Sequence, residues 1–236
     1  MATQLPRPTT ALVLAGGKGE RLRPLTDSRP KPMVEVNGVP IVEHHLRWLS
    51  ANGVRRAVLL TGYLHEVIDD YFAVPRVDGL TVDCIAEERP LGRGGALRRG
   101  FELAGIAEET VIATNGDVLT DQAIAPMVEL HHRMGAAVTL MLTQMSSPYG
   151  VVWAADDGRV MGFDEKPLLP YWINAGVYVV ATDTFAQFPE EGDHETSTFP
   201  ALAAAGRIVA LRSVAFWRSV ESAKELREVT EYFMAR

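Results

Sequence analysis

The chain has 236 residues, of which 47% are hydrophobic, and carries a formal net charge of −7 at pH 7. This length is sufficient to bury a sizeable core and fits one large α/β domain. The acidic balance argues against a nucleic-acid partner, and the absence of a long apolar run argues against a membrane partner. The single cysteine, Cys84, lies in an apolar run and predicts a buried strand residue in a reducing compartment. We therefore expect a soluble, cytoplasmic protein.

A glycine-rich, basic segment follows the first apolar run. Residues 11–15 are apolar or small and predict a buried strand, and no helical periodicity follows until Pro40. Three closely spaced glycines let the main chain approach a ligand and turn consecutive N–H groups toward it, and three cations bring positive charge to the same loop. These six residues are Gly16, Gly17, Gly19, Arg21, Arg23 and Lys31. A polyphosphate is the ligand that such a loop suits.

Two common phosphate-binding motifs are absent from this loop. A P-loop requires Ser or Thr after Gly-Lys, whereas Gly19 follows Lys18, and a dinucleotide fingerprint requires a third glycine where Leu22 stands. The pattern L-A-G-G-x-G-x-R-L, with Lys31-Pro32 further on, instead resembles the signature of the sugar-1-phosphate nucleotidyltransferases, or nucleotide-sugar pyrophosphorylases. The resemblance implies that four residues of the loop bind the nucleotide: Leu14, Ala15, Gly16 and Gly17.

Strands and helices alternate in the first half of the chain. The expected helices cover residues 40–52, 64–72, 96–105 and 122–135, and the expected strands cover residues 55–63, 80–88 and 110–115. This alternation predicts a parallel sheet with helices on its faces and a ligand at the carboxyl ends of the strands. We expect Asp121 to cap the last of these helices, and His131 and His132 to lie on its surface.

A second loop, residues 87–97, reads E-E-R-P-L-G-R-G-G-A-L. It resembles the E-x-P-L-G-T-x-G segment with which the family holds the nucleotide base, with Arg93 in place of the usual threonine. The resemblance implies that Glu88 and Gly94 bind the nucleotide, and Glu87 is a further candidate. A carboxylate can accept hydrogen bonds from guanine N1–H and N2–H2 together, which favours guanine. The alternative is an acidic surface pair beside a helix N-terminus.

Asp117 follows an apolar strand directly, in the sequence Asn115-Gly116-Asp117. A carboxylate at this edge of the sheet is well placed to hold Mg²⁺ while phosphates and water fill the other positions. The position also resembles the family's Gly-Asp metal site. We therefore expect Asp117 to be a ligand of Mg²⁺, the expected cofactor.

From residue 137 onward the pattern changes to strands separated by turn signals. The expected strands cover residues 137–144, 149–154, 158–167 and 171–180, and we expect them to cover the sugar. Matches to the family imply four residues that bind the sugar and its phosphate: Gly150, Glu165, Lys166 and Asn174. Lys166 would be the cation for the phosphate, whereas Glu165 and Asn174 would hydrogen-bond hydroxyl groups.

The C-terminal region departs from the family pattern. Most relatives carry W-x-D-I-G-T, whose aspartate is a second metal ligand, and here Ser219 stands in its place. Glu221, two positions later, can supply the missing carboxylate, as in cytidylyl-transferring relatives whose acidic residue is shifted. Glu221 can equally be the acidic first turn of a helix. Both interpretations remain open at this point.

The resemblance implies a single α/β domain over residues 1–236, a Rossmann-like three-layer α/β/α sandwich with a mixed, mainly parallel central sheet. Residues 9–135 would form the nucleotide-binding half and residues 136–236 the sugar-binding half, without an additional β-helix domain. The implied partners are a nucleoside triphosphate and a sugar 1-phosphate, which react to give a nucleoside diphosphate sugar and pyrophosphate. The residues that would catalyse this reaction are Arg21, Lys31, Asp117 and Lys166. Exposed helix faces would permit a homodimer.

Several alternatives remain for the substrate and the function. The sequence looks similar to guanylyltransferases for manno-configured heptose or mannose 1-phosphate, and we expect GTP with such a sugar phosphate. Its opening motif looks equally similar to uridylyltransferases for amino-sugar or muramic-type phosphates, which are the alternative. Cytidylyl and thymidylyl transfer are further options. A regulatory paralogue that binds nucleotide-sugar without turnover would explain Ser219. A glycosyltransferase would require a D-x-D motif after a strand, which the chain lacks.

Overall fold

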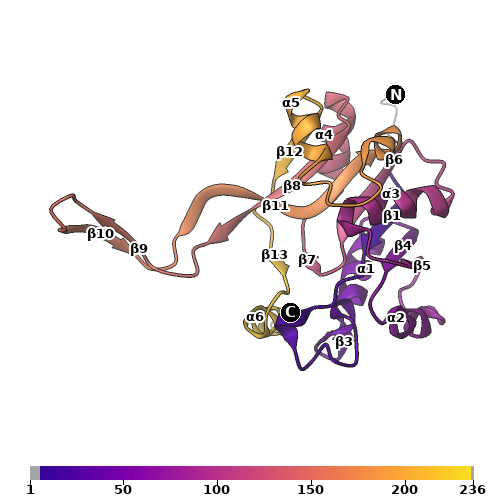
Figure 1. Ribbon diagram of the computed structural model, residues 1–236, viewed down its shortest axis with the longest axis horizontal. Helices are drawn as coiled ribbons and strands as arrows, with labels where there is room; N and C mark the ends of the chain where they lie inside the picture. The colour runs from indigo at the N-terminus through magenta and orange to yellow at the C-terminus, as the bar shows by residue number, and fades with distance from the viewer. Residues whose placement is uncertain (1–5, 235–236) are drawn as a thin grey trace.

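A seven-stranded sheet forms the centre of the computed structural model, which describes residues 6–234 (Figure 1). In spatial order its strands are β12 (Ile208–Arg212), β8 (Val138–Ser146), β11 (Leu168–Ala181), β6 (Thr110–Asn115), β1 (Thr10–Leu14), β4 (Arg56–Thr61) and β5 (Thr81–Ala86). All neighbouring pairs are parallel except those of β11, which runs antiparallel to β6 and to β8. Because β5 is an edge strand, Cys84 lies in a strand as predicted but is only half-buried.

Helices cover both faces of this sheet. One face packs against α1 (Ile41–Ala51), α2 (His65–Phe72) and α4 (Ala125–Met134), and the other against α3 (Gly92–Ala104), the 3-10 helix η3 (Thr182–Gln187) and α5 (Thr198–Ala204). Alternate residues of each strand point to opposite faces, so Ala11 and Val13 of β1 contact the first layer whereas Leu12 contacts the second. This arrangement confirms the predicted three-layer α/β/α fold. Within residues 6–234, no helix is long and apolar enough to cross a membrane.

Helix α3 begins earlier than the sequence predicted. Its first turn already contains the glycines at Gly94 and Gly95, which were expected in a ligand-binding loop. Their N–H groups donate to the carbonyl oxygen of Gly192 at 2.9 and 3.2 Å, and a Cβ atom at Gly94 would lie 2.8 Å from the main-chain nitrogen of His194. These glycines therefore allow the helix to pack tightly against the segment before α5.

Two predictions for α4 were wrong. The helix begins at Ala125, and the N–H of Ile124 is bound by the side-chain oxygen of Asn52 at 2.9 Å, so Asp121 does not cap it. Asp121 instead accepts a hydrogen bond from the hydroxyl group of Tyr232. His131 is buried rather than on the surface, because α4 packs its side chain against β8, where it lies 3.0 Å from the Thr139 hydroxyl.

A small hydrophobic cluster, separate from the two layers that cover the sheet, places the last helix beside the first loop. It joins η1 (Glu20–Leu22), the residue that follows η2 (Lys31–Met33), the first residue of α1, and α6 (Ala223–Met234). It also includes a residue of β2 (Glu35–Val36), which forms a hairpin with β3 (Val39–Pro40). Its buried residues are Leu22, Val34, Val36, Ile41, Leu119, Val220 and Val229. Nearby, β13 (Trp217–Ser219) pairs antiparallel with β7 (Val118–Thr120), with Ser219 opposite Val118. This pairing brings the C-terminal region next to Asp117.

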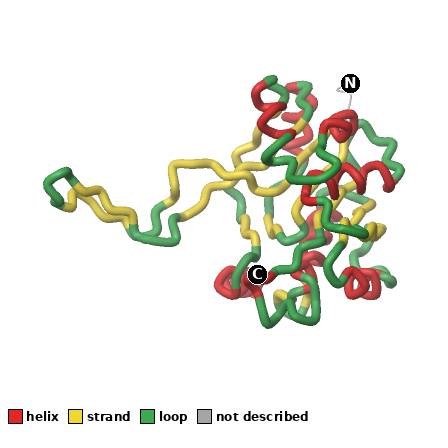
Figure 2. Tube along the Cα trace, in the orientation of Figure 1, coloured by secondary structure: helices red, strands yellow, loops and turns green. Residues whose placement is uncertain are grey.

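Strands β8 and β11 extend beyond the central sheet as a long arm (Figures 1 and 2). At its far end, β9 (Val151–Ala154) and β10 (Val160–Asp164) form a separate two-stranded ribbon. Strands β8, β11 and β12 belong to the central sheet, whereas this ribbon projects from the body. The expectation that these strands cover the sugar stays a prediction, since the ribbon lies beside no other described element in this structure.

Three buried histidines predict a loss of stability in mild acid. Burial lowers the pKa of His45, His131 and His194 to about 4, whereas unfolded histidine titrates near pH 6.5. Between these values the unfolded chain binds more protons, so the free energy of unfolding falls as the pH falls. At about pH 5 each histidine should contribute a loss of about 2 kcal/mol relative to neutral pH. Urea denaturation at both pH values measures this loss.

A His194→Leu variant provides the control. Both ring nitrogens of His194 lack a hydrogen-bond partner, and its Nδ1 lies 3.5 Å from a carboxylate oxygen of Glu195. The variant should lose about one third of the pH dependence, because one of the three buried imidazoles is gone. An unchanged slope would show that His194 does not titrate as described.

Candidate functional site

A cleft of about 380 Å³ opens at the carboxyl ends of β1, β4 and β6. Its walls come from the two loops singled out in the sequence and from the C-terminal region. The lining residues used below are Leu14, Gly16, Gly17, Lys31, Glu87, Gly92, Arg93, Asp117, Asp193 and Glu221. The sheet therefore brings residues that are far apart in the chain to one edge, as expected for parallel strands.

The glycine-rich loop folds back onto the segment that carries Lys31. Gly19 has a φ of 65°, and a Cβ atom there would lie only 2.7 Å from the Cβ of Lys31. The N–H of Lys31 donates to the carbonyl oxygen of Gly17 at 3.3 Å, and the Thr26 hydroxyl donates to that of Gly19 at 2.9 Å. Gly19 thus permits the close approach that sets the position of the Lys31 ammonium group.

Replacing Gly19 by alanine should therefore reduce turnover strongly while lowering the free energy of unfolding only slightly. The left-handed conformation costs a non-glycine residue about 1 kcal/mol, and the new methyl group would displace Lys31. We expect turnover to fall by about tenfold or more while the protein stays folded. The matched control is Gly38→Ala, which carries the same left-handed strain with no atom within 4 Å of its Cβ. Equal loss of turnover in both variants would contradict the argument.

Lys31, Asp117 and Glu221 converge in the cleft. The Lys31 Nζ lies 2.5 Å from Asp117 Oδ2 and 2.6 Å from Glu221 Oε1. The side chains of Lys31 and Asp117 are only 9% and 18% exposed. Burial acts to lower the pKa of Lys31, but the Asp117 and Glu221 carboxylates outweigh it, so that the pKa is raised. The ammonium group is thus held charged between two carboxylates.

The pairing of β13 with β7 explains why Glu221 reaches this position. The N–H of Val220 donates to the carbonyl oxygen of Asp117 at 3.3 Å, which fixes the following residue beside Asp117. The Ser219 hydroxyl lies 3.4 Å from Glu221 Oε1. Glu221 was interpreted either as a carboxylate of the site or as part of the first turn of a helix. The structure supports the first interpretation, because Glu221 lines the cleft. Helix α6 starts at Ala223, so that Glu221 precedes it.

The other predicted residues of the first loop take different positions. Leu14, Gly16 and Gly17 line the cleft. Ala15 is buried, and its N–H donates to the carbonyl oxygen of Leu60 at 2.8 Å, so its main chain belongs to the sheet. Arg21 is 81% exposed, with its guanidinium 3.9 Å from Glu221. Arg21 therefore stands near the mouth of the cleft, free to move toward a ligand.

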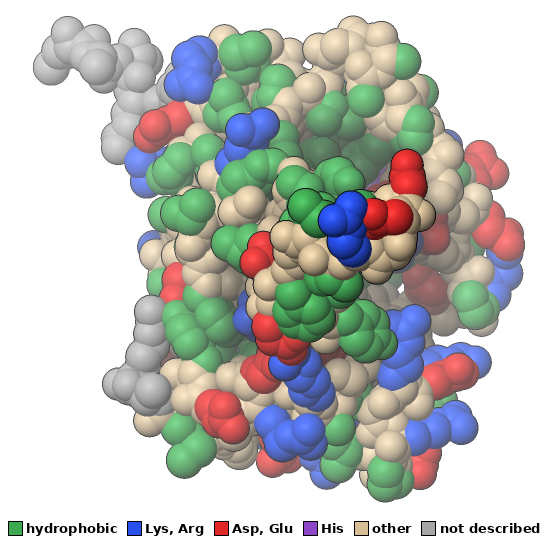
Figure 3. Space-filling view, turned by 90° about the vertical axis from the view of Figure 1, so that its left-hand side faces the viewer, with side chains coloured by type: hydrophobic (Ala, Val, Ile, Leu, Met, Phe, Trp, Pro, Cys, Tyr) green, Lys and Arg blue, Asp and Glu red, His purple; other side chains and the backbone are tan. Residues whose placement is uncertain are grey.

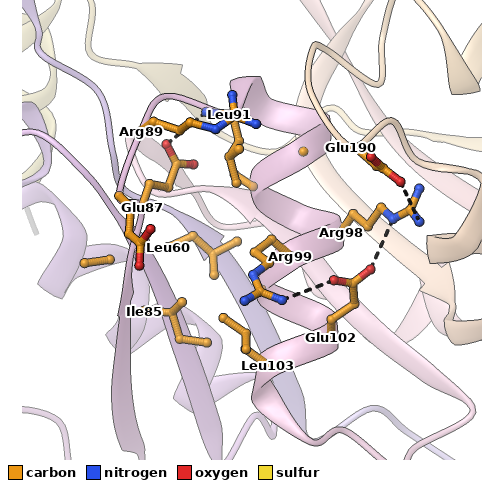
Figure 4. Close-up of a pocket in the computed structure, with 15 residues that line it drawn as sticks. Leu60, Ile85, Glu87, Arg89, Leu91, Arg98, Arg99, Glu102, Leu103 and Glu190 are labelled. Atoms are coloured by element: carbon orange, nitrogen blue, oxygen red, sulfur yellow. Dashed lines mark hydrogen bonds and ion pairs between the residues drawn. The ribbon is translucent and has the colours of Figure 1, made fainter.

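Glu87, rather than Glu88, lines the cleft together with Asp117. Glu88 lines a neighbouring pocket of about 420 Å³ between β5 and α3, whose wall Glu87 also shares (Figure 4). Burial raises the pKa of the Glu87 carboxyl, although a hydrogen bond from the N–H of Leu91 opposes the shift. Gly94 is buried in α3, and Gly92 occupies the cleft wall instead.

The predicted sugar-binding residues lie apart from the cleft. Gly150, Glu165 and Lys166 are close together on the arm, since a Cβ at Gly150 would lie 3.0 Å from a Glu165 oxygen and Lys166 Nζ lies 3.7 Å from the other. None of the three lines the cleft of residues 6–234 described above. Asn174, on β11, donates to the hydroxyl group of Tyr178 at 2.8 Å and accepts from the N–H of Gly176.

A comparison with protein families identifies the chain. The family model described as "Nucleotidyl transferase" matches residues 10–234. The chain belongs to the nucleotidyl transferase family. The match covers both loops, Asp117, the arm and Glu221, so every part of the site described above lies within the family's extent.

Two relatives illustrate the similarity in sequence. The chain is 36% identical over 219 residues to the mannose-1-phosphate guanylyltransferase of Mycobacterium tuberculosis, a match that covers 89% of this chain and 60% of the relative. It is 37% identical over 172 residues to the D-glycero-alpha-D-manno-heptose 1-phosphate guanylyltransferase of Aneurinibacillus thermoaerophilus. This match covers 72% of this chain and 73% of that relative. The chain thus spans about three fifths of the length of the mannose-1-phosphate guanylyltransferase.

Solved structures show the same nucleotidyl transferase fold. HddC from Yersinia pseudotuberculosis superposes with a TM-score of 0.77 at 24% identity, covering 95% of this chain and 99% of HddC. A UDP-glucose pyrophosphorylase complexed with UDP-glucose superposes with a TM-score of 0.76 at 19% identity. The superposition covers 98% of this chain and 100% of the pyrophosphorylase. These likenesses establish the fold.

The site has one feature that the sequence did not reveal. Arg93, which replaces the usual threonine, donates from its main-chain nitrogen to Asp193 Oδ1 at 3.0 Å and pairs through its guanidinium with Asp193 at 3.0 Å and with Glu195 at 2.9 Å. These contacts attach the first turn of α3 to the segment before α5. Because the partners are about a hundred residues apart, no local pattern could have identified them.

Proposed function

We propose that the protein is a Mg²⁺-dependent sugar-1-phosphate nucleotidyltransferase, which converts a nucleoside triphosphate and a sugar 1-phosphate into a nucleoside diphosphate sugar and pyrophosphate. The observation that carries the proposal is the convergence of Asp117 and Glu221 on one cationic position in a cleft walled by the glycine-rich loop. Glycines in the cleft wall, together with nearby cations, suit a triphosphate at this place.

The residues present fit a Mg²⁺ ion. The Lys31 ammonium group stands in for a cation, since it lies within 2.6 Å of an oxygen from each of Asp117 and Glu221. Mg²⁺ prefers oxygen ligands and is commonly held by one or two carboxylates, with phosphates and water in its other positions. Asp117 and Glu221 would hold the ion, and Lys31 would then be free to turn toward the phosphates.

The remaining chemistry is positioning and neutralisation of charge, and no protein nucleophile is required. When bound, Mg²⁺ supplies positive charge to the phosphates. Gly16 and Gly17 present main-chain groups to the triphosphate, Lys31 stabilises its charge, and Arg21 holds the pyrophosphate that leaves. A phosphate oxygen of the sugar 1-phosphate attacks the α-phosphorus in line. Lys166 lies on the arm outside the cleft, so it would hold that phosphate only after approaching the cleft.

GTP and a manno-configured hexose or heptose 1-phosphate are the proposed substrates. The names of the relatives in Mycobacterium tuberculosis and Aneurinibacillus thermoaerophilus support this choice, as does a structure of HddC complexed with GMP-PN. The carboxylate of Glu87 lies in the cleft wall and can accept from guanine N1–H and N2–H2. We further propose that residues 9–135 serve the nucleotide and that residues 136–236 serve the sugar.

Pyrophosphate release with Mg²⁺ tests the proposal. GTP, UTP, CTP, dTTP and ATP would each be combined with the 1-phosphates of mannose, glucose, N-acetylglucosamine and a manno-heptose. We expect release with GTP and a manno-configured sugar phosphate. Release with another pairing would overturn the substrates but not the reaction. Binding of nucleotide-sugar by calorimetry without release from any pairing would instead support a regulatory paralogue.

A further inference from the structure

Exposed hydrophobic side chains concentrate on the arm. Of the fifteen large hydrophobic side chains that are exposed among residues 6–234, nine lie between residues 145 and 171. Seven of them are at least half exposed: Tyr149, Trp153, Val160, Met161, Phe163, Leu168 and Tyr171. Figure 3 looks along the arm and shows hydrophobic side chains beside its charged tip. The body of the protein has no comparable concentration within the described residues.

Both faces of the ribbon at the end of the arm are apolar. Val152 is paired with Phe163 across the two strands, and Trp153 is paired with Gly162, so the two pairs lie on opposite faces. The Trp153 ring lies over Gly162, where a Cβ atom would be 3.1 Å away. None of the other described elements lies beside this ribbon (Figures 1 and 2).

Such a ribbon is not expected to persist uncovered in water. An isolated two-stranded hairpin is marginally stable, and stability normally requires a third strand or a packed face. The outer edges of β9 and β10 also carry unpaired main-chain groups, which favour pairing with another strand. Concentrations of exposed apolar side chains of this kind mark interaction sites on soluble proteins.

The area available matches a dimer interface. Large aromatic side chains bury about 150–250 Å² each, so the exposed parts of the nine side chains amount to on the order of 1,000 Å², compared with about 800 Å² per partner in a standard interface. The charges of the arm argue against an anionic membrane surface as the occupant. Between residues 146 and 167 there are four acidic and two basic side chains: Asp156, Asp157, Asp164, Glu165, Arg159 and Lys166.

We propose that the arm is a self-association surface, on which the ribbon of a second copy of this chain packs around a two-fold axis. A two-fold contact requires one surface to complement itself, and a ribbon with two apolar faces and two free edges meets this requirement. The exposed helix faces of the body are then not needed for dimerisation.

The contact would also order the residues proposed for the sugar phosphate. A Cβ atom at Gly150 would lie 2.6 Å from the Phe163 ring, so Gly150 and Glu165 lie directly beside the apolar surface of the ribbon. Packing of a second copy against Phe163 would limit the motion of this region. This consequence rests on the proposed function, whereas the contact itself does not.

Sedimentation velocity on the full chain, without substrates, tests the proposal. The wild type should have twice the 25.8 kDa mass of one chain. The double variant Val160→Lys/Met161→Lys should raise the dissociation constant by about a hundredfold or more and yield monomers, because each lysine would be buried twice in a two-fold contact. Both residues are exposed, so circular dichroism should show an unchanged fold.

The matched control is Val214→Lys/Met134→Lys, which changes the same residue types at exposed positions outside the arm. It should remain dimeric. Three results would overturn the proposal: a wild type that stays monomeric over a wide range of concentrations, a dimer that survives the arm substitutions, or a dimer that the control substitutions also dissociate. Because no activity is measured, the outcome is independent of the proposed reaction.

Discussion

Replacing Asp117 by asparagine is expected to reduce pyrophosphate release by about a thousandfold or more, which corresponds to about 4 kcal/mol of transition-state stabilisation. Asparagine keeps the shape of the side chain but removes the negative charge that lies 2.5 Å from the Lys31 ammonium group. The site would then hold a divalent cation through Glu221 alone. Steady-state kinetics with the best pairing of substrates measures the effect.

The matched control for this variant is Asp121→Asn. Asp121 follows β7 closely in sequence but lies outside the cleft and accepts from the Tyr232 hydroxyl. It should retain turnover, and both variants should keep the circular dichroism spectrum of the wild type. Full activity of Asp117→Asn would refute the assignment of Asp117 to the cation site.

Replacing Glu221 by glutamine is expected to raise the Mg²⁺ concentration needed for half-maximal turnover by about tenfold or more, since removal of a ligand carboxylate weakens binding of a hard cation. Glu221 contacts the cationic position at 2.6 Å. Ser219→Ala is the comparison, because the Ser219 hydroxyl lies 3.4 Å from Glu221 and only at the limit of a hydrogen bond.

Glu221→Gln should therefore change the Mg²⁺ concentration needed for half-maximal turnover more than Ser219→Ala does. Ser219→Ala should change the Mg²⁺ dependence by less than about threefold, because a partly buried hydroxyl at the limit of hydrogen-bond distance contributes little. Titration of Mg²⁺ at saturating substrates gives both values. The reverse ranking would show that Ser219, and not Glu221, acts at the position of the family's second aspartate.

Local patterns predicted six of the seven strands of the central sheet, all except β12, together with the helices α1 to α4, but not η3 or α5. Apolar runs bounded by glycine and proline predicted β1, β4, β5 and β6, and a helical period predicted α1 within one residue of its start. These features depend on neighbours in sequence, so periodicity detects them. The start of α3 was missed because its glycines look like a loop, whereas tertiary packing against Gly192 makes them helical.

The candidate site was predicted in composition but not in geometry. The loop pattern identified the glycines and Lys31, and the position directly after an apolar strand identified Asp117. The resemblance of the second loop favoured Glu88, with Glu87 as a further candidate, whereas Glu87 lines the cleft, because the choice depends on the direction in which the chain leaves β5. The N–H of Glu87 donates to the carbonyl oxygen of Thr61 at 2.9 Å, which extends the β5 pairing and sets which carboxylate faces the cleft.

The sequence by itself determined the class of fold and the chemical character of the first loop, because both arise from residues close together in the chain. Only the tertiary structure decided that Glu221 joins Asp117 around Lys31, through the pairing of β13 with β7. It also decided that Arg93 joins Asp193 and that the ribbon of β9 and β10 projects from the body (Figure 1). Contacts between distant segments depend on how whole elements pack, and no local pattern encodes that packing.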